Sequence, residues 1–211
     1  MSSQCNHFNH RNHHSLGLLV AIYDCENTTI LGSAYVYSLD DDGTWSLQQK
    51  LLPTNIDPTS DRFGVAVSTS GDRVVIGADL DDSQGNDSGA AYVYLISKGV
   101  WKLESKLLPS VGDYSGYHCG SSVDISSDGR TIAVGCPDAP GGGVVYVYSL
   151  QDEGKWVQKD KLTIPPSTYL PSQVKNLMLG HSVATTPGDE GIVVSGYGQL
   201  YGDVFSYSKK C

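Results

Sequence analysis

Aspartate and tyrosine side chains gather in the segments that separate the apolar runs of this 211-residue chain. Carboxylates beside tyrosines suit a surface for polar ligands, because tyrosine offers a large contact area at a low cost in conformational entropy. We expect these segments to be loops on one face that binds a protein or a glycan; the alternative is that Asp and Tyr simply occupy exposed turns. The residues expected on that face are Asp57, Asp61, Asp79, Asp81, Asp82, Asp87, Asp113, Tyr114, Tyr117, Asp138, Tyr169, Tyr197 and Tyr201.

Catalytic groups are harder to find in the sequence. A glycosidase needs two carboxylates facing each other across a cleft, and a nucleophilic hydrolase needs a base beside its nucleophile. Only Asp124 and His181 are expected to face a central channel, and the sequence gives neither of them a partner. We therefore predict no catalytic residue and interpret both as polar groups satisfied on inner strands.

The five cysteines show no metal-type spacing. Cys119 begins one predicted strand and Cys136 ends the next, so an antiparallel hairpin would bring them within disulfide reach. The alternative is a pair of buried thiols that fill the positions of Phe63 and Ala78 in the preceding repeat.

Two further features lie outside these loops or at their edges. Asn27 and Asn86 each begin an Asn-x-Ser/Thr sequon, which favours an extracellular location, although no clear signal peptide is present. The histidines of the first fifteen residues offer imidazoles to a transition metal, but a disordered tail over 1–15 is the simpler interpretation.

A repeated signature shows which elements must position these residues. Glycine, any two residues, an aromatic residue, any residue and then tyrosine recur with the aromatic positions 57, 54 and 59 residues apart. Such a period, with strand-forming residues in every copy, indicates an array of small β-sheets. The copies occupy residues 32–37, 89–94, 143–148 and 202–207.

Each full repeat reads as four antiparallel strands, which is the description of a β-propeller blade. Continuous apolar runs such as 74–76 and 131–134 predict interior strands covered on both faces. The segment from Trp101 alternates, which places Trp101, Leu103 and Leu107 on one face of an outer strand with the intervening charges in solvent.

The resulting fold class is all-β, a partial β-propeller with two complete four-stranded blades flanked by two three-stranded ones, fourteen strands in all. The propeller arc spans 16–211. Its predicted units are 16–62, 63–118, 119–178 and 179–211. A closed propeller needs at least four blades, so we expect further blades or another copy to complete the ring.

Composition excludes two classes of partner. The chain has 23 acidic against 14 basic residues, a net charge of −9, and no basic stretch, so we expect no nucleic acid. The longest apolar run, 16–23, is far shorter than the roughly 20 residues that span a bilayer, so we expect no membrane span.

The steps Phe63-Gly64 and Gly77-Ala78, followed by the signature 89–94, resemble the FG-GAP repeat, best known from the heads of integrin α chains. The resemblance covers about residues 18–207 and implies a propeller. In that family calcium is the usual cofactor, held by an Asp-rich loop between the first two strands. Here the corresponding loops, such as 69–72, are too short to supply the six to eight oxygen ligands that calcium needs, so we predict no cofactor. The acidic loop 79–87 has enough oxygen atoms for calcium, but its place in the repeat and the spacing of its acidic residues do not match a calcium site. We interpret it as a solvated turn.

From these features we predict a non-enzymatic binding module of FG-GAP type, acting in adhesion or surface recognition as part of a longer extracellular protein. Two alternatives remain open. One is a fragment of a carbohydrate-active propeller enzyme, a lyase or a hydrolase. The other is an incomplete gene product without independent function.

Overall fold

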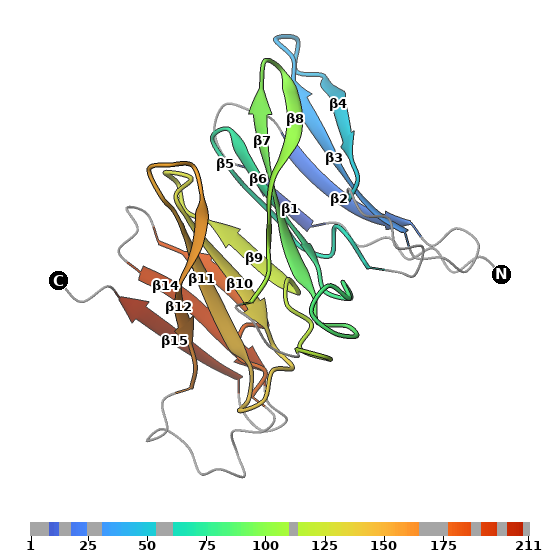
Figure 1. The fold of residues 1–211 in the computed structure, drawn as a ribbon. Helices are drawn as coiled ribbons and strands as arrows, with labels where there is room; N and C mark the ends of the chain where they lie inside the picture. Colours follow the sequence, from blue (N-terminus) through green and yellow to red (C-terminus); the bar gives the residue numbers. More distant parts are fainter. Residues whose placement is uncertain are drawn as a thin grey trace.

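The computed structural model describes residues 9–12, 18–24, 31–53, 61–109, 114–164, 177–186, 191–197 and 202–208. These residues form β-strands and no helix, in four antiparallel sheets that follow one another along the chain (Figure 1).

We call the sheets blades 1 to 4. Blade 1 contains β1 (Asn9–Asn12), β2 (Leu18–Asp24), β3 (Leu31–Leu39) and β4 (Trp45–Leu51). Blade 2 contains β5 (Val67–Ser70), β6 (Arg73–Ala78), β7 (Ala90–Ser97) and β8 (Val100–Leu107). Blade 3 contains β9 (Ser122–Ile125), β10 (Thr131–Cys136), β11 (Val144–Leu150) and β12 (Trp156–Leu162). Blade 4 contains β13 (Ser182–Thr185), β14 (Gly191–Tyr197) and β15 (Gly202–Ser208).

The blades stand side by side in an arc that does not close, as predicted for a partial propeller (Figure 1). Within each blade the strands pair in chain order. The first strands of neighbouring blades contact one another, β1 with β5, β5 with β9 and β9 with β13. These strands therefore form the inner side of the arc.

Blade 1 has one more strand than the sequence analysis assigned to it. Asn9–Asn12 pairs antiparallel with Leu18–Ala21 and completes a four-stranded sheet, inside the segment 1–15 that we predicted as a disordered tail. Strand pairing uses backbone groups, so the polar sequence Asn-His-Arg-Asn forms a strand without any apolar alternation to announce it.

The hydrophobic core lies in three layers between successive blades. Val74 and Ile76 of β6 pack toward blade 1, whereas Val75 between them packs toward blade 3. In β10, Ile132 packs toward blade 2 and Ala133 toward blade 4. The continuous apolar runs are thus interior strands, because alternating side chains enter opposite layers and both faces of the sheet are buried.

The outer strands carry a β-bulge that the sequence did not reveal. In blade 2, Tyr92 pairs with Lys106 but Tyr94 pairs with Leu103, so one extra residue interrupts the register; blades 1 and 3 have the same irregularity. A bulge reverses which face the following residues point to. Leu107 therefore packs toward blade 3 while Trp101 packs toward blade 1, and the prediction that they share a face is wrong.

Close backbone contact between blades explains the second glycine of each repeat. A Cβ atom on Gly77 would lie 2.0 Å from the carbonyl oxygen of Gly120, and one on Gly135 would lie 2.0 Å from that of Gly180. No side chain fits at such distances. The glycine spacing of the sequence is therefore set by the packing of one blade on the next.

The final tyrosine of the signature also joins blades. The hydroxyl of Tyr94 donates a hydrogen bond to the carbonyl of Leu52 in blade 1 (2.7 Å), and that of Tyr207 donates to Thr163 after blade 3 (2.9 Å). Leu52 and Thr163 each lie two residues after the lysine of the outer strand. Burial raises the pKa of Tyr94 to about 12, so this hydroxyl keeps its proton.

Candidate functional site

The loops of blades 2 and 3 form one continuous surface, which we call the loop face. The segment between β6 and β7 runs beside the segment that leads into β9, and backbone hydrogen bonds join them. Tyr114 N–H donates to Gln84 (3.0 Å), His118 N–H to Asp87 (3.1 Å) and Cys119 N–H to Ser88 (3.0 Å). The two segments run parallel to each other at this point, so residues distant in sequence lie side by side.

Eight of the thirteen residues predicted for a binding face lie on these loops or beside them. They are Asp61, Asp79, Asp81, Asp82, Asp87, Tyr114, Tyr117 and Asp138. Asp57, Asp113, Tyr169 and Tyr201 lie outside the described residues, and Tyr197 ends β14 with its side chain undescribed. Ligand binding by this group stays a prediction.

Asp81 holds the loop together rather than facing a ligand. It is buried, and its carboxylate accepts hydrogen bonds from the hydroxyl of Tyr92 (2.6 Å) and the backbone N–H of Ser83 (2.9 Å) and pairs with Lys106 (2.6 Å). Burial acts to raise the pKa of Asp81, but the hydrogen bonds from Lys106, Ser83 and Tyr92 outweigh it, so this pKa lies below its ordinary value. Lys106 also lies over the Tyr92 ring, 5.0 Å from its centre, and the other two Lys–Tyr pairs of the repeat do the same.

Asp79 forms a second buried carboxylate, paired with Arg62. Arg62 Nε lies 2.9 Å from Asp79 Oδ1, and the other guanidinium arm bonds Oδ2. The Asp79 side chain is 4% exposed and that of Arg62 35%. Burial raises the pKa of Asp79, and Arg62 and His118 counteract it only in part.

His118 and Asp138 form the polar pair of the loop face that reaches solvent. Nδ1 of His118 lies 2.6 Å from Oδ2 of Asp138, and the side chains are 30% and 42% exposed. A carboxylate only accepts hydrogen bonds, so Nδ1 carries the proton of this contact, and in the neutral form of such a ring the lone pair lies on Nε2. Such an arrangement orients an imidazole as a general base.

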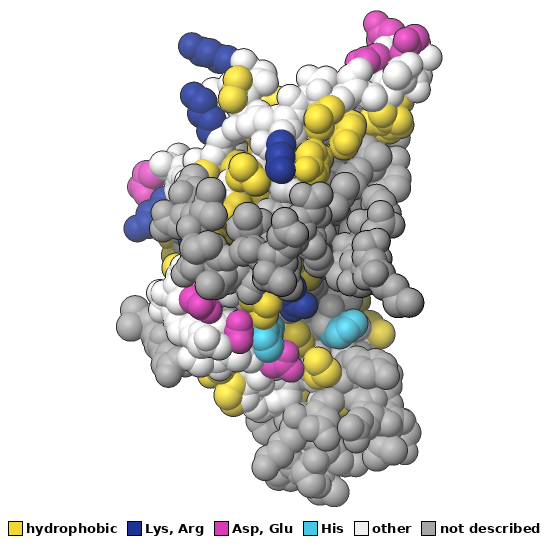
Figure 2. All heavy atoms as spheres, turned by 90° about the vertical axis from the view of Figure 1, so that its right-hand side faces the viewer, with side chains coloured by type: hydrophobic (Ala, Val, Ile, Leu, Met, Phe, Trp, Pro, Cys, Tyr) yellow, Lys and Arg dark blue, Asp and Glu magenta, His cyan; other side chains and the backbone are white. Residues whose placement is uncertain are grey.

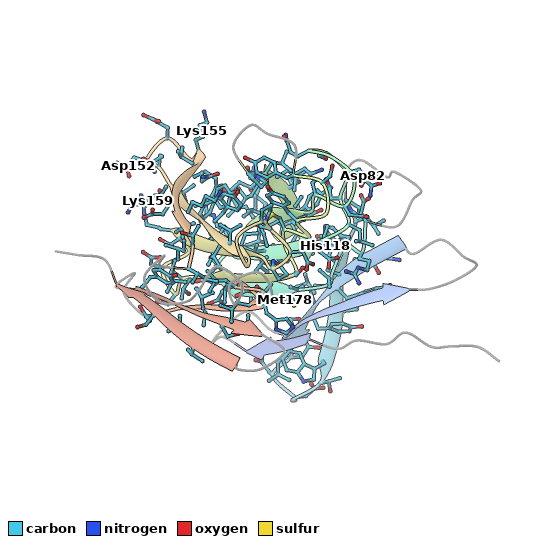
Figure 3. The ribbon with its side chains drawn as sticks, turned by 90° about the horizontal axis from the view of Figure 1, so that it is seen from below. Asp82, His118, Asp152, Lys155, Lys159 and Met178 are labelled. Carbon is cyan, nitrogen blue, oxygen red and sulfur yellow. A yellow bond between two sulfur atoms is a disulfide. The ribbon has the colours of Figure 1, made fainter. Side chains whose placement is uncertain are left out.

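Arg62, His118 and Met178 occupy the same position of the repeat, directly before Phe63-Gly64, Cys119-Gly120 and Leu179-Gly180. All three have left-handed backbones, with φ of 47°, 51° and 45°. This conformation is unfavourable for residues with a side chain, and it recurs at functional sites. Figure 3 shows His118 and Met178 in the same central region of the molecule. Sequence reasoning missed Arg62, His118 and Met178 as site residues, although their place before each aromatic- or cysteine-glycine step was a usable signal.

Asp124 connects three blades on the inner side of the arc. Its carboxylate accepts hydrogen bonds from the hydroxyl of Ser68 in β5 (2.6 Å) and from the backbone N–H (2.7 Å) and hydroxyl (2.9 Å) of Thr185 in β13. Asp124 is 4% exposed. A carboxylate bonded on both oxygens to neighbouring strands aligns blades and is a poor candidate for catalysis.

The sulfur atoms of Cys119 and Cys136 are joined in a disulfide, the outcome that the sequence left open beside buried thiols. Asn86 of the second sequon is exposed, and its side-chain amide bonds Asp87 (2.7 Å); Asn27 lies outside the described residues.

Over the ranges that the structure describes, no three His, Cys, Asp or Glu side chains approach closely enough to hold a metal ion. The same ranges include no helix with the length and hydrophobicity of a membrane span.

The sequence pattern of the FG-GAP repeat matches residues 45–94, which run from β4 through β7, and the described sheets form a propeller-like arc. The resemblance inferred from the sequence is therefore confirmed. A sequence search of curated proteins gave no match.

Three solved structures similar to the chain are propeller-like proteins of low sequence identity. The periplasmic gluconolactonase of Pseudomonas aeruginosa is 20% identical, with a TM-score of 0.57 over 92% of this chain and 50% of that one. A Bacteroides uniformis protein assigned as a 6-phosphogluconolactonase is 13% identical, with a TM-score of 0.50 over 92% and 54%. Sqt1 of Chaetomium thermophilum is 16% identical, with a TM-score of 0.51 over 84% and 38%. The chain thus spans about half the length of the first two structures, and at these identities the likeness defines the fold.

These comparisons correct the leading functional prediction. The proposed non-enzymatic adhesion module is contradicted, because two of the three similar structures carry the names of lactonases and none carries that of an adhesion protein. The alternative drawn from the sequence, a carbohydrate-active propeller enzyme, agrees better with them.

Proposed function

We propose that this chain contributes the His118–Asp138 pair to a β-propeller enzyme that hydrolyses a sugar lactone. The observation that carries the proposal is the 2.6 Å contact between His118 Nδ1 and Asp138 Oδ2 at a solvent-reaching position of the loop face. The names of the similar lactonases give the substrate class.

The chemistry asks for one general base and no covalent intermediate. With Nδ1–H held by Asp138, Nε2 of His118 accepts a proton from a water molecule while the water oxygen attacks the lactone carbonyl. The tetrahedral carbon then releases the ring oxygen, which takes the proton from Nε2. The product is the open-chain hydroxy acid, and water supplies all the added atoms. General-base help of this kind contributes about 10²–10⁴-fold to a rate.

The direct test measures acid release from glucono-1,5-lactone by the protein in its complete assembly, corrected for spontaneous hydrolysis. We expect His118→Gln to lower the catalysed rate about 100-fold or more. Lys155→Gln is the matched control, because Lys155 lies on the hairpin between β11 and β12, away from His118 (Figure 3). An assembly no faster than the background, or a His118→Gln assembly as fast as the parent, contradicts the proposal.

We further propose that the active assembly has more blades than this chain. Trp101 and Trp156 are 6% and 7% exposed, since each packs against the preceding blade, but Trp45 of blade 1 is 41% exposed. Gln49 of β4 bonds both backbone groups of Trp101, and Glu104 of β8 accepts a hydrogen bond from Trp156. Leu39, Trp45 and Leu47 of blade 1 are exposed, and Figure 2 shows that hydrophobic side chains reach the surface on this side of the molecule. The repeat itself indicates the occupant, an outer strand of a further blade.

Sedimentation of the purified chain separates the two sources of such blades. A second copy gives a dimer that Trp45→Gln weakens; a monomer at all concentrations means that the blades come from the same polypeptide.

We propose that the protein is located outside the cytosol, because disulfides persist in oxidising compartments and Asn86 is an exposed sequon. Finding Cys119 as a free thiol in protein isolated from its cells would contradict that location.

A further inference from the structure

The disulfide of blade 3 lies beside the proposed catalytic pair. Cys119 directly follows His118, and Cys136 precedes Asp138 by two residues. Both cysteines are fully buried, and their bond links the segment that leads into β9 to the end of β10. The bond therefore joins the two backbone segments that carry the imidazole and the carboxylate.

Little freedom remains between the disulfide and each polar group. Pro137, the residue between Cys136 and Asp138, has its φ fixed by its ring. The turn after it is held by the hydrogen bond from Ala139 N–H to Cys136 (3.3 Å). On the other side, the carbonyl of His118 accepts a hydrogen bond from the hydroxyl of Ser121 (2.6 Å). The disulfide thus restrains the separation of the two backbone segments from which these side chains extend.

Blade 2 shows what the same position looks like without the covalent link. Phe63 and Ala78 replace the cysteines, and Phe63 packs edge-on against Tyr92 with ring centres 5.3 Å apart. The polar pair there is Arg62 with Asp79, and the long guanidinium side chain reaches its carboxylate with two hydrogen bonds. Imidazole is shorter and offers one nitrogen to the carboxylate, so it tolerates less variation in backbone separation.

We propose that the Cys119–Cys136 disulfide is a positioning element that holds His118 Nδ1–H on Asp138. This inference rests on the proposed function for its effect on catalysis, but the geometry it asserts exists whether or not the substrate is a lactone. Cys119 and Cys136 are thus positioning residues, while His118 is the group that contacts water and substrate.

The test replaces the two cysteines by the residues that occupy their positions in blade 2, Phe63 and Ala78. The double variant is Cys119→Phe/Cys136→Ala. Nitrogen NMR of histidine-labelled protein at about pH 8, where an unperturbed imidazole is neutral, reports which ring nitrogen carries the proton; His118→Gln assigns the signal. In the parent we expect one Nδ1–H tautomer for His118. In the double variant we expect a mixture of tautomers and a roughly tenfold lower rate of lactone hydrolysis.

Ile132→Ala provides the matched control. Ile132 is fully buried in the same core layer, so its truncation destabilises blade 3 while His118, Asp138 and both cysteines stay unchanged in sequence. All proteins are compared below their unfolding temperatures. The proposal is overturned if the double variant keeps the single Nδ1–H tautomer, or if Ile132→Ala loses it to the same extent. Absence of lactone hydrolysis in the parent protein contradicts only the proposed function, because the tautomer reports positioning independently. If the double variant fails to fold, Cys136→Ala alone is measured by the same criteria.

Discussion

Blades 2 and 3 present the same backbone at the loop face and fill it with different chemistry. Each places a left-handed residue before the inner strand and a carboxylate after the second strand. In blade 2 the pair is Arg62 with the buried Asp79, and in blade 3 it is His118 with Asp138, both reaching solvent. The repeated backbone therefore carries different side-chain pairs: in blade 2 the carboxylate is buried under its arginine, and in blade 3 both the carboxylate and the imidazole are partly exposed.

The largest expected effect concerns the close backbone contact that each of the two blades makes with the next blade through a glycine. Gly77→Ala and Gly135→Ala would each place a methyl group 2.0 Å from a backbone oxygen of the next blade. We expect each to lower the free energy of unfolding by about 3 kcal/mol, because backbone cannot move aside as a side chain does. Urea unfolding measures the change. Gly154→Asn is the control, since a Cβ at Gly154 meets nothing within 4 Å and Asn tolerates its φ of 77°. If the two substitutions lower the free energy of unfolding by unequal amounts, the backbone contacts between blades also differ in strength.

The next effect separates the two polar pairs. Arg62→Met leaves the buried carboxylate of Asp79 without its cation, and we expect a loss of about 2 kcal/mol at neutral pH, less than for a fully buried pair because Arg62 is 35% exposed. Burial already raises the pKa of Asp79, and removing Arg62 raises it further. A group with a raised pKa stabilises the fold at low pH and loses that contribution as the pH rises through its folded value. The variant should therefore be closer to the parent at acid pH than at neutral pH, and a constant difference would contradict the assignment.

Acid sensitivity provides a third comparison, within the loop of blade 2. The pKa of Asp81 is lowered: burial opposes ionisation, but the hydrogen bonds from Lys106, Ser83 and Tyr92 favour it more strongly. A carboxyl with a lowered pKa contributes stability above its unfolded value of about 3.9, and this contribution disappears as the pH falls through the folded value. Asp81→Asn should be less stable than the parent at neutral pH and lose less stability on acidification. Parallel stability curves for parent and variant below about pH 4 would contradict this role.

The smallest expected effect on stability comes from blade 3. Asp138 is 42% exposed, so Asp138→Asn should change the free energy of unfolding by no more than about 0.5 kcal/mol. The same substitution should release the His118 tautomer and slow lactone hydrolysis. A large loss of stability would show that the His118–Asp138 pair stabilises the fold, as the ion pairs of blade 2 do.

Much of the fold follows from local pattern. The repeated Gly-x-x-aromatic-x-Tyr signature and the apolar runs gave the blades and the buried strands, because a two-residue alternation in sequence is a two-face alternation in a sheet. The sequence did not predict β1 or the bulges. Backbone pairing in Asn9–Asn12 leaves no side-chain pattern, and the extra residue in β8 only changes which face of the sheet the following side chains point to.

The site was predictable as a region but not as a pair. The loops that carry Asp79, Asp81 and Asp138 were expected on one face, whereas His118 was not expected to matter. Its partner lies twenty residues away, and only the distance between Nδ1 and Oδ2 reveals the contact.

Glycine spacing and apolar alternation act between near neighbours along the chain, so the sequence was enough to predict an array of small antiparallel sheets. The tertiary structure decided which carboxylates are buried, which one contacts an imidazole, and which tryptophan is exposed. Those properties depend on what lies across the gap between blades, and residues there are separated by a whole repeat in sequence.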